Sequence, residues 1–566
     1  MTATLNRPAE TPPTSEPTSA PTFEDALTRK SSRAYIVLFV VTLLLTPVLI
    51  LVGADQGYGT ILAALAALIA LALVPWKPIW GLYLVVICAV VVEQEPLIAT
   101  PIGTDHLNIF YWPTHLQGLP ERPIGFFILA ILLVLVITAV LFRRRALYGG
   151  RLFYPFLFFF ACLAIGVLHG LATGGSFKVI VLEIRPWWYF FVSYILAYNI
   201  VSEVKHVRNI IWITVIGTAI KGVQGVFIVY TYLGGQIEGH NEIMAHEQSF
   251  FFVLVLLLLV MMLLHHFQRA LFFAIIASLP CLLLALVANN RRADYVALLL
   301  GILVAWVMVI LVKPAKRRAL ITALAICLLF GGAYVLAFQK SSGALGQPAR
   351  AVISVFNPSA SDERDASSNA YRIVENYDLK YTESTSPFLG IGFGKPFQQP
   401  VALPNVLELD PYYLYIPHNN VLWVWMRLGP LGFGALWYLF GSAIVAGCMI
   451  VRRLRNPQLQ YFAIFTLAMV MMEVILAYGD YQFFFYRNMI YVGVALGVLM
   501  KLPAIDRKAM GEPSSHDDRL NDAIATIHTK PRPRARLDVP LSLPAPISAM
   551  AARVADETFG WKWSHS

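Results

Sequence analysis

Charged residues are scarce in this chain, and their scarcity excludes a soluble globular protein. Only 13% of the 566 residues are Asp, Glu, Lys or Arg, whereas 58% are hydrophobic, and the mean hydropathy is +0.65. Soluble domains carry about 25% charged residues. The composition therefore predicts an integral membrane protein.

Cysteine is also rare, and its placement excludes two further classes. The five cysteines all fall inside apolar blocks, and none lies in the one long polar stretch between residues 338 and 417. Neither a disulfide framework nor a cysteine-based metal site is indicated.

The first 33 residues lack the apolar core of a cleaved signal peptide. They are rich in Pro, Thr, Ser and Glu, which predicts a disordered cytoplasmic tail, with the first span acting as its own insertion signal. Residues 504–566 are likewise expected to form a cytoplasmic, mostly disordered tail.

Long apolar blocks fill the rest of the chain. A span needs roughly 20 apolar residues to cross about 30 Å of hydrocarbon, and about fourteen blocks meet this requirement. We therefore predict an all-α polytopic membrane protein with helices 1–11 in residues 34–337, one long extracytoplasmic loop at 338–417, and helices 12–14 in residues 418–503. The expected spans are 34–53, 58–75, 79–99, 123–142, 152–171, 187–202, 207–232, 249–265, 268–288, 293–313, 318–338, 418–450, 458–477 and 482–501.

The block at 418–450 is too long for a simple crossing. Gly429-Pro430 lies in its first half, and proline disrupts the helical hydrogen bonds of the preceding turn. We expect a short helix that begins near His418, then a bend, then the membrane crossing.

The net charge of +10 on its own would also suit a nucleic-acid-binding protein. However, Lys and Arg cluster in alternate short loops, for example at 143–145, 313–318 and 452–455, as the positive-inside rule requires. We therefore predict no nucleic-acid partner and place both termini in the cytoplasm. No 20–50-residue repeat and no inverted pair of broken helices is visible.

Three arginines stand at expected outer ends of spans, where the positive-inside bias disfavours them. Arg185 precedes a proline and two tryptophans, and Arg291 and Arg292 lie between two spans. Snorkelling, or pairing with Glu183 or Asp294, is one explanation. Binding of an anionic lipid headgroup is the other, because guanidinium groups match phosphate oxygens in a bidentate manner.

His418 opens an apolar helix at the end of the polar stretch. A polar interface residue is one interpretation, and a general base is the other, because imidazole titrates near neutrality. Lys221, Glu473 and Arg427 lie inside apolar blocks, where structural ion pairs are expected. Arg487, near an outer boundary, is a weaker candidate for phosphate binding.

Two polar segments carry no prediction of chemistry. The segment GIGFGKPF (390–397) is not a phosphate-binding loop, because Leu389 and Pro396 stand where that motif needs Gly and Ser or Thr. The acidic segment SDERD (361–365) is interpreted as a solvated loop, and no metal site is predicted.

Four stretches together resemble the O-antigen ligase and O-antigen polymerase superfamily of bacterial envelope glycosyltransferases. They are Arg185 before its apolar span, NRRADYVALLLG (290–301), YRIVENYDLKYTESTSPFLGIGFGKPF (371–397) and HNNVLWVWMRLGPLGF (418–433). The last two are the more specific, and the resemblance covers about residues 180–440. The chain departs from the family pattern at Asn290, Arg292 and Arg427, which leaves both Arg291 and Arg292 as phosphate candidates.

The resemblance implies a C-type glycosyltransferase-like fold in the cytoplasmic (inner) membrane. The reaction would move a glycan from an undecaprenyl-diphosphate carrier to a hydroxyl of a glycan or lipid acceptor on the outer face, with inversion and without a metal or other cofactor. His418 would act as the base, and Arg185, Arg291 and Arg292 would bind the diphosphate. Arg372 is a weaker candidate that would contact the donor or seat the loop.

Three alternatives stay open from the sequence. A polymerase of the same superfamily would differ only in its acceptor. A transporter or flippase of an anionic glycolipid would need charged residues along a path through the bilayer. An inactive homologue would act as a scaffold in an envelope-synthesis complex.

Overall fold

The structure is a computed structural model that describes most of the expected membrane region. The described residues are 77–93, 123–137, 147–237, 242–341, 343, 346–356, 363–404, 412–512 and 526–527. Residues 1–527 form one compact unit, and residues 528–566 form a second unit that lies outside the described residues.

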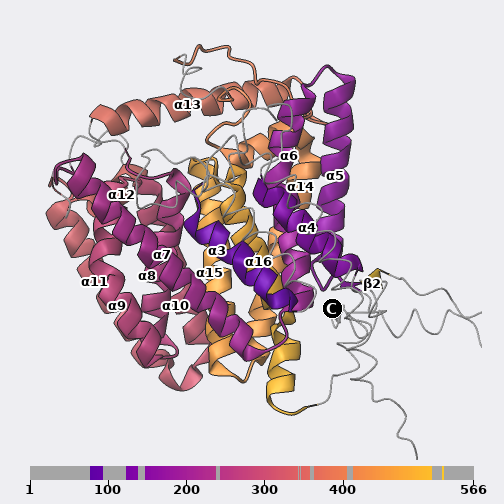
Figure 1. Ribbon diagram of the computed structural model, residues 1–566. Helices are drawn as coiled ribbons and strands as arrows, with labels where there is room; N and C mark the ends of the chain where they lie inside the picture. The colour runs from indigo at the N-terminus through magenta and orange to yellow at the C-terminus, as the bar shows by residue number, and fades with distance from the viewer. Residues whose placement is uncertain are drawn as a thin grey trace, which may run out of the picture. The chain divides into compact units, whose positions relative to one another are not determined.

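Helices make up most of the described chain (Figure 1). The only sheet in these ranges joins β1 to β2 in an antiparallel pair, with Leu147 opposite Ile527. The prediction of an all-α polytopic membrane protein is confirmed. The elements are α3 (Pro78–Val91), α4 (Pro123–Ile137), β1 (Leu147–Tyr148), α5 (Phe153–Ala172), α6 (Phe177–Ile200), α7 (Val204–Tyr232), α8 (His246–Leu264), α9 (Arg269–Ala288), α10 (Arg292–Val312), η4 (Pro314–Lys316), α11 (Arg317–Phe338), α12 (Gln347–Phe356), α13 (Glu363–Ser384), α14 (Asn420–Arg453), α15 (Pro457–Gly479), η6 (Gln482–Phe484), α16 (Tyr486–Ala509) and β2 (Thr526–Ile527).

Ten helices in the described ranges are long and apolar enough to cross a membrane. They correspond to the ten expected spans from 152–171 onwards. The expected spans at 34–53 and 58–75 lie outside the described residues, as do the N-terminal tail and nearly all of the C-terminal tail. The shorter helices α3 and α4 cover the described parts of the expected spans at 79–99 and 123–142.

Helix α6 begins ten residues before the expected start, so Arg185 and Pro186 lie inside it. The main-chain N–H of Ser176, the residue before the helix, donates to Gly394 O (2.9 Å), and Gly394 N–H donates in turn to Glu183 Oε2 (2.6 Å). A segment more than 200 residues away thus holds the first turns of α6. The local sequence does not contain this contact, and the expected start at residue 187 was therefore too late.

Helices α6 and α16 pack closely because two glycines of α16 face α6. A Cβ atom on Gly493 would lie 2.4 Å from Phe190 O, and one on Gly497 would lie 2.4 Å from Tyr194 O. Small residues four apart allow membrane helices to approach this closely. This contact places the start of α16 beside α6.

The expected bend in the 418–450 block is confirmed. Gly429 has φ 64° and ψ −170° inside α14, and Pro430 follows it. A Cβ atom at Gly429 would lie 2.3 Å from Phe388 O, so both the conformation and the close contact require glycine. The helix begins at Asn420, and the Asn419 side chain accepts a hydrogen bond from Leu422 N–H (3.0 Å) as its cap.

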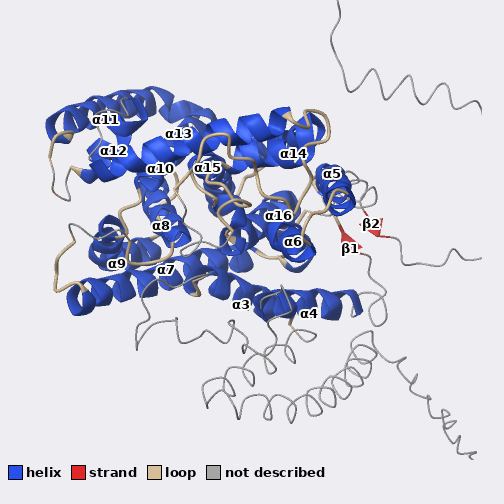
Figure 2. Ribbon diagram, turned by 90° about the horizontal axis from the view of Figure 1, so that it is seen from above, coloured by secondary structure: helices blue, strands red, loops and turns tan. Residues whose placement is uncertain are grey.

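The stretch expected to be a loop contains two helices, α12 and α13. Helix α13 lies across one end of the bundle, hereafter the α13 end (Figure 1), and Figure 2 shows it between α12 and α14. Its polarity suggested a loop, but Glu375, Asp378, Leu379 and Thr382 are buried at helical spacing. Tertiary contacts of this one face therefore stabilise a helix that is polar on average.

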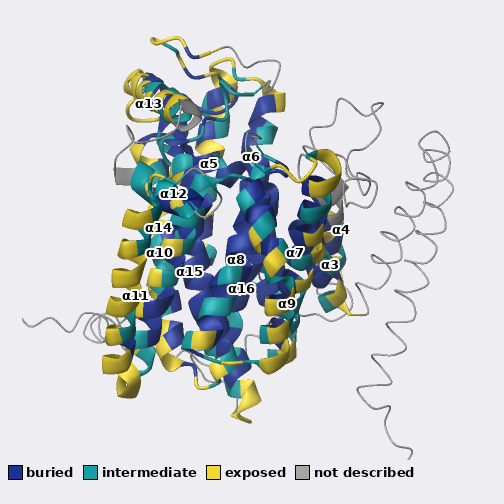
Figure 3. Ribbon diagram, turned by 90° about the vertical axis from the view of Figure 1, so that its left-hand side faces the viewer, coloured by how far each residue is buried: buried dark blue, intermediate teal, exposed yellow. Residues whose placement is uncertain are grey.

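Burial separates central helices from peripheral ones (Figure 3). Helices α8, α15 and α16 are mostly buried, whereas Leu320 is the single buried residue of α11. An apolar helix exposed over most of its surface suits contact with lipid, since lipid tails are as apolar as leucine.

Candidate functional site

His418 lies at the α13 end, immediately before α14, and contacts a glutamate of α13. Its Nδ1 lies 3.1 Å from Glu375 Oε1, and its main-chain N–H donates to Glu375 Oε2 (3.1 Å). Glu375 is 1% exposed, whereas the His418 side chain is 29% exposed. A carboxylate at Nδ1 fixes the tautomer and leaves Nε2 to accept a proton. The two residues form a dyad suited to general base catalysis.

Arg291 is the centre of an ion cluster between α8, α10 and α15. Its Nη1 donates to Glu242 Oε1 (2.8 Å) and lies 3.3 Å from His246 Nε2, and its Nη2 donates to Asp480 Oδ2. Burial opposes the charge of Arg291, but Asp480 and Glu242 outweigh it and raise the pKa of the guanidinium. Arg291 therefore stays cationic at any physiological pH.

The two carboxyl groups that contact Arg291 have lowered pKa values. Burial raises the pKa of Asp480, but the charge of Arg291 outweighs it, so the pKa lies well below its usual value. The pKa of Glu242 is also lowered, because the hydrogen bond from His246 and the charge of Arg291 exceed the effect of burial. Both carboxyls are ionised at neutral pH.

A small pocket of about 60 Å³ opens beside this cluster. Three of its lining side chains are arginines, Arg291, Arg292 and Arg372, and one is Glu242. Arg292 Nη2 donates to Asn369 Oδ1 (3.2 Å) on α13. Burial lowers the pKa of Arg372 while the charge of Asp480 opposes this change. Three guanidinium groups against the carboxylates of Glu242 and Asp480 leave a net positive charge that suits a phosphate-type anion.

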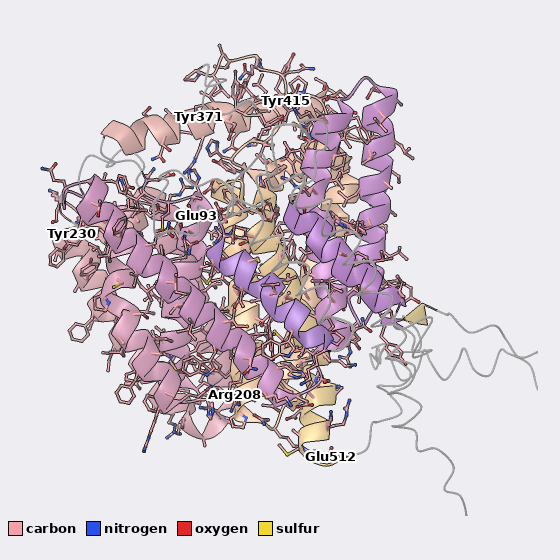
Figure 4. All side chains as sticks on the ribbon, viewed as in Figure 1. Glu93, Arg208, Tyr230, Tyr371, Tyr415 and Glu512 are labelled. Atoms are coloured by element: carbon pink, nitrogen blue, oxygen red, sulfur yellow. The ribbon has the colours of Figure 1, made fainter. Side chains whose placement is uncertain are left out.

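Tyr481 connects the dyad to the ion cluster. Its ring centroid lies 5.3 Å from that of His418 and 5.5 Å from that of His246, and it directly follows Asp480. The Tyr371 ring of α13 lies 5.5 Å from the His418 ring on another side. Figure 4 labels Tyr371 and Tyr415 at this end and Arg208 and Glu512 at the opposite end. The candidate base and the arginine pocket thus share one end of the bundle.

Arg185 is close to this region but does not line the pocket. It is 5% exposed, and its Cζ lies 5.7 Å from the centroid of the Tyr486 ring. The ring of Trp187, two residues later, lies 5.0 Å from the ring of Phe483. Arg185 therefore supports the 480–486 segment from the α6 side, while Arg291, Arg292 and Arg372 come together.

Arg487 is fully buried, and all of its nitrogens donate to protein oxygens. Nε donates to Ala89 O (2.9 Å), Nη1 to Glu247 Oε1 (3.0 Å), and Nη2 to Val90 O and Gln248 Oε1 (both 2.8 Å). These bonds tie α16 to α3 and α8 and assign Arg487 a structural position.

Two of the three buried ionisable residues form the expected ion pairs. Arg427 Nη2 lies 2.6 Å from Glu183 Oε1, with both side chains fully buried, and Lys221 pairs with Glu93. Arg427 also donates to the carbonyl oxygens of Gly392, Lys395 and Tyr415, at 3.1, 2.6 and 3.1 Å. It thereby fastens the GIGFGKPF segment to α14.

Glu473 differs from that expectation. No basic side chain pairs with it in the part of the chain that the structure describes, and Asn488 is the polar neighbour of its carboxyl group.

The sequence reasoning missed Glu375, Glu242, His246 and Asp480. Glu242 and His246 stand four residues apart in the stretch between two expected spans, 207–232 and 249–265, and this spacing was the available signal. Asp480 and Glu375 carried no comparable signal, because their partners lie far away in the chain. No group of three or more His, Cys, Asp or Glu side chains within the described ranges has the geometry to hold a metal ion.

Residues 277–438 match the family model described as O-Antigen ligase. The matched region runs from within α9 to the middle of α14 and includes Arg291, Arg292, Arg372, Glu375 and His418. No curated protein matches the chain.

Proposed function

We propose, from the match of residues 277–438 to the O-antigen ligase family model and from the geometry of the site, that this protein is a ligase of that kind. It moves a glycan from an undecaprenyl-diphosphate carrier to an acceptor hydroxyl. The observation that carries the proposal is the His418–Glu375 dyad at the same end of the bundle as a pocket lined by three arginines.

The proposed chemistry follows from these positions. His418 Nε2 takes the proton of the acceptor hydroxyl, and Glu375 stabilises the imidazolium that forms. The hydroxyl oxygen attacks the anomeric carbon from the side opposite the carrier, so the new glycosidic bond has inverted configuration. The bond to the carrier breaks, and its electron pair leaves with the diphosphate.

The arginine pocket receives that leaving group. Charge builds on the diphosphate as the bond breaks, and preorganised cationic donors are worth about 3 to 4 kcal/mol each when they meet developing charge. Arg291, Arg292 and Arg372 supply this charge, and the reaction is proposed to need no metal. Arg185 contributes from outside the pocket by holding the 480–486 segment.

The α13 end is proposed to face the extracytoplasmic side of the inner membrane. Helix α10 starts at Arg292 at this end, so the basic run between α10 and α11 lies at the opposite end, where Figure 4 labels Arg208 and Glu512, the ion-pair partner of Arg455. Basic loops stay in the cytoplasm. Both termini are proposed to lie in the cytoplasm as well, as the alternation of basic loops in the sequence predicts.

Transfer assays with purified protein test the proposal. His418→Ala and Arg291→Ala are each expected to reduce glycan transfer at least about 10²-fold, because each removes a group that acts in the transition state. His169→Ala is the matched control, a histidine of α5 outside the site, and should retain activity. Retained activity in both site variants would refute the mechanism.

A second assay separates ligase from polymerase and transporter. A cell without the gene should accumulate long lipid-linked chains if the protein is a ligase, and single lipid-linked units if it is a polymerase. Flux of the lipid-linked glycan across liposomes without covalent change would support a transporter instead. The closed ion pairs of Arg427 and Lys221 count against a charged path through the bundle.

A further inference from the structure

Glu242 occupies the arginine pocket that the proposed function assigns to a diphosphate. It lines the pocket, and its Oε1 accepts from Arg291 Nη1 (2.8 Å). Its Oε2 contacts His246 Nε2, four residues later. A carboxylate therefore already accepts the hydrogen bond of the guanidinium nitrogen to which a phosphate oxygen would bind.

The two carboxylates bound to Arg291 are not equivalent. Asp480 is 1% exposed, and besides Nη2 of Arg291 it accepts from Tyr481 N–H (3.0 Å) and Gln482 Nε2 (3.3 Å). Glu242 is 13% exposed, and its hydrogen-bond donors in the described ranges are Arg291 and His246. Asp480 therefore holds the guanidinium in place through Nη2, while Nη1 and Glu242 are the groups able to exchange partners.

His246 is placed to accept Glu242 when Nη1 leaves it. Its Nε2 contacts Glu242, and its Nδ1 is buried 3.8 Å from Asp480 Oδ2. Both ring nitrogens thus face carboxylates, which favours the imidazolium, whereas Arg291 Nη1 at 3.3 Å disfavours it. Rotation of Nη1 towards a phosphate oxygen removes that repulsion.

We propose that Glu242 is a resident counter-ion of the pocket, which a diphosphate ester displaces from Arg291 onto His246, and that His246 takes up a proton from solvent in the same step. This inference rests on the proposed function and adds the ionic exchange by which the donor enters. His246 is a positioning residue, since it acts on the donor through Glu242 and Arg291. By linkage, donor affinity rises as pH falls through the range in which His246 titrates.

The charged and titratable groups around His246 come from five segments. Glu242 precedes its own helix, Arg291 and Asp294 belong to the start of α10, and Asp480 and Tyr481 follow α15. Two more residues act on these groups rather than on His246 itself: Arg372 of α13 interacts with Arg291 and Asp480, and His418, which precedes α14, interacts with Asp480. The nearest of these, Glu242 and Asp480, are the ones that stabilise a proton on His246.

Calorimetric titration of the full-length protein in detergent tests the exchange. Farnesyl diphosphate serves as the probe, and each titration is run in two buffers with different ionisation enthalpies, so that the difference in heat counts protons. The wild type is expected to take up protons on binding at pH 7.5 and to bind more tightly as the pH falls towards 6.5.

Two variants and a control identify the groups. His246→Gln keeps a hydrogen-bonding side chain at this position but cannot titrate, so proton uptake should vanish and the affinity should lose its pH dependence. Glu242→Gln removes the competing charge and should bind about tenfold tighter, also without proton uptake. Glu203→Gln alters an exposed ion pair with Lys205 outside the pocket and should match the wild type. Thermal unfolding of each variant verifies that it is folded.

Binding by the wild type without proton uptake, or wild-type uptake in His246→Gln, would overturn the exchange and leave the proposed function intact. Absence of any binding to the wild type would overturn both, because the pocket would then not accept a diphosphate.

Discussion

Replacement of Glu375 by Gln isolates the dyad, because the amide keeps an acceptor for the main-chain N–H of His418 but removes the charge. At the least, the substitution replaces a charge-assisted hydrogen bond to the His418 imidazolium by a neutral one, which costs about 1.5 kcal/mol. The upper bound is the attraction between a carboxylate and an imidazolium at the observed 3.1 Å, about 5 kcal/mol at an effective dielectric constant of about 20. His418 is 29% exposed, so solvent screens the pair. We therefore expect a loss of about 10²-fold in kcat.

The assay is transfer of a lipid-linked glycan to acceptor, with kcat and KM for the donor measured separately. KM should change little, because Glu375 does not line the arginine pocket. In a His418→Ala background the same substitution should have almost no further effect, since residues that act as one unit are not additive. Independent losses that multiply in the double variant would refute a role of Glu375 through His418, and a change confined to KM would refute it equally.

Two further predictions concern the ion pairs. Arg427→Leu leaves Glu183 fully buried without a counter-charge and should destabilise the protein by about 3–5 kcal/mol, measured as thermal unfolding in detergent. The double variant with Glu183→Leu should recover part of this loss, and an equally unstable double variant would contradict the pairing. The depressed pKa of Asp480 means that its ion pair with Arg291 stabilises the fold at neutral pH and loses this contribution only as pH falls below about 4. Asp480→Asn should therefore unfold at a lower temperature than wild type from pH 8 to pH 5, with the gap closing only in stronger acid, and a gap already closed at pH 5 would argue against the pair.

The membrane-spanning helices can be predicted from the sequence because the bilayer sets the same requirement for every span. A crossing needs an apolar run long enough to satisfy its own main-chain hydrogen bonds, and such runs are visible without knowledge of their neighbours. The ten expected spans from 152–171 onwards fall at observed helices, and the bend at Gly429-Pro430 was predictable because both residues constrain their own backbone.

Errors arise where a distant contact overrides the local signal. The start of α6 moved by ten residues because the GIGFGKPF segment binds its first turns through Gly394. Helix α13 looked like a loop because its average polarity hides a buried face set by contacts with α14. Neither contact can be predicted from the sequence of the segment that it stabilises.

Residue type alone determined which groups could do chemistry in this protein: arginines at the ends of spans are costly unless they bind something, and a histidine before an apolar helix titrates near neutral pH. Only the tertiary structure decided which of them act together. It brought Arg291, Arg292 and Arg372 to one pocket, buried Arg487 among structural acceptors, and supplied Glu375, Glu242, His246 and Asp480 as partners. The physical reason is that an ion pair or a dyad depends on distance in space, and its members in this protein lie up to 244 residues apart in the chain.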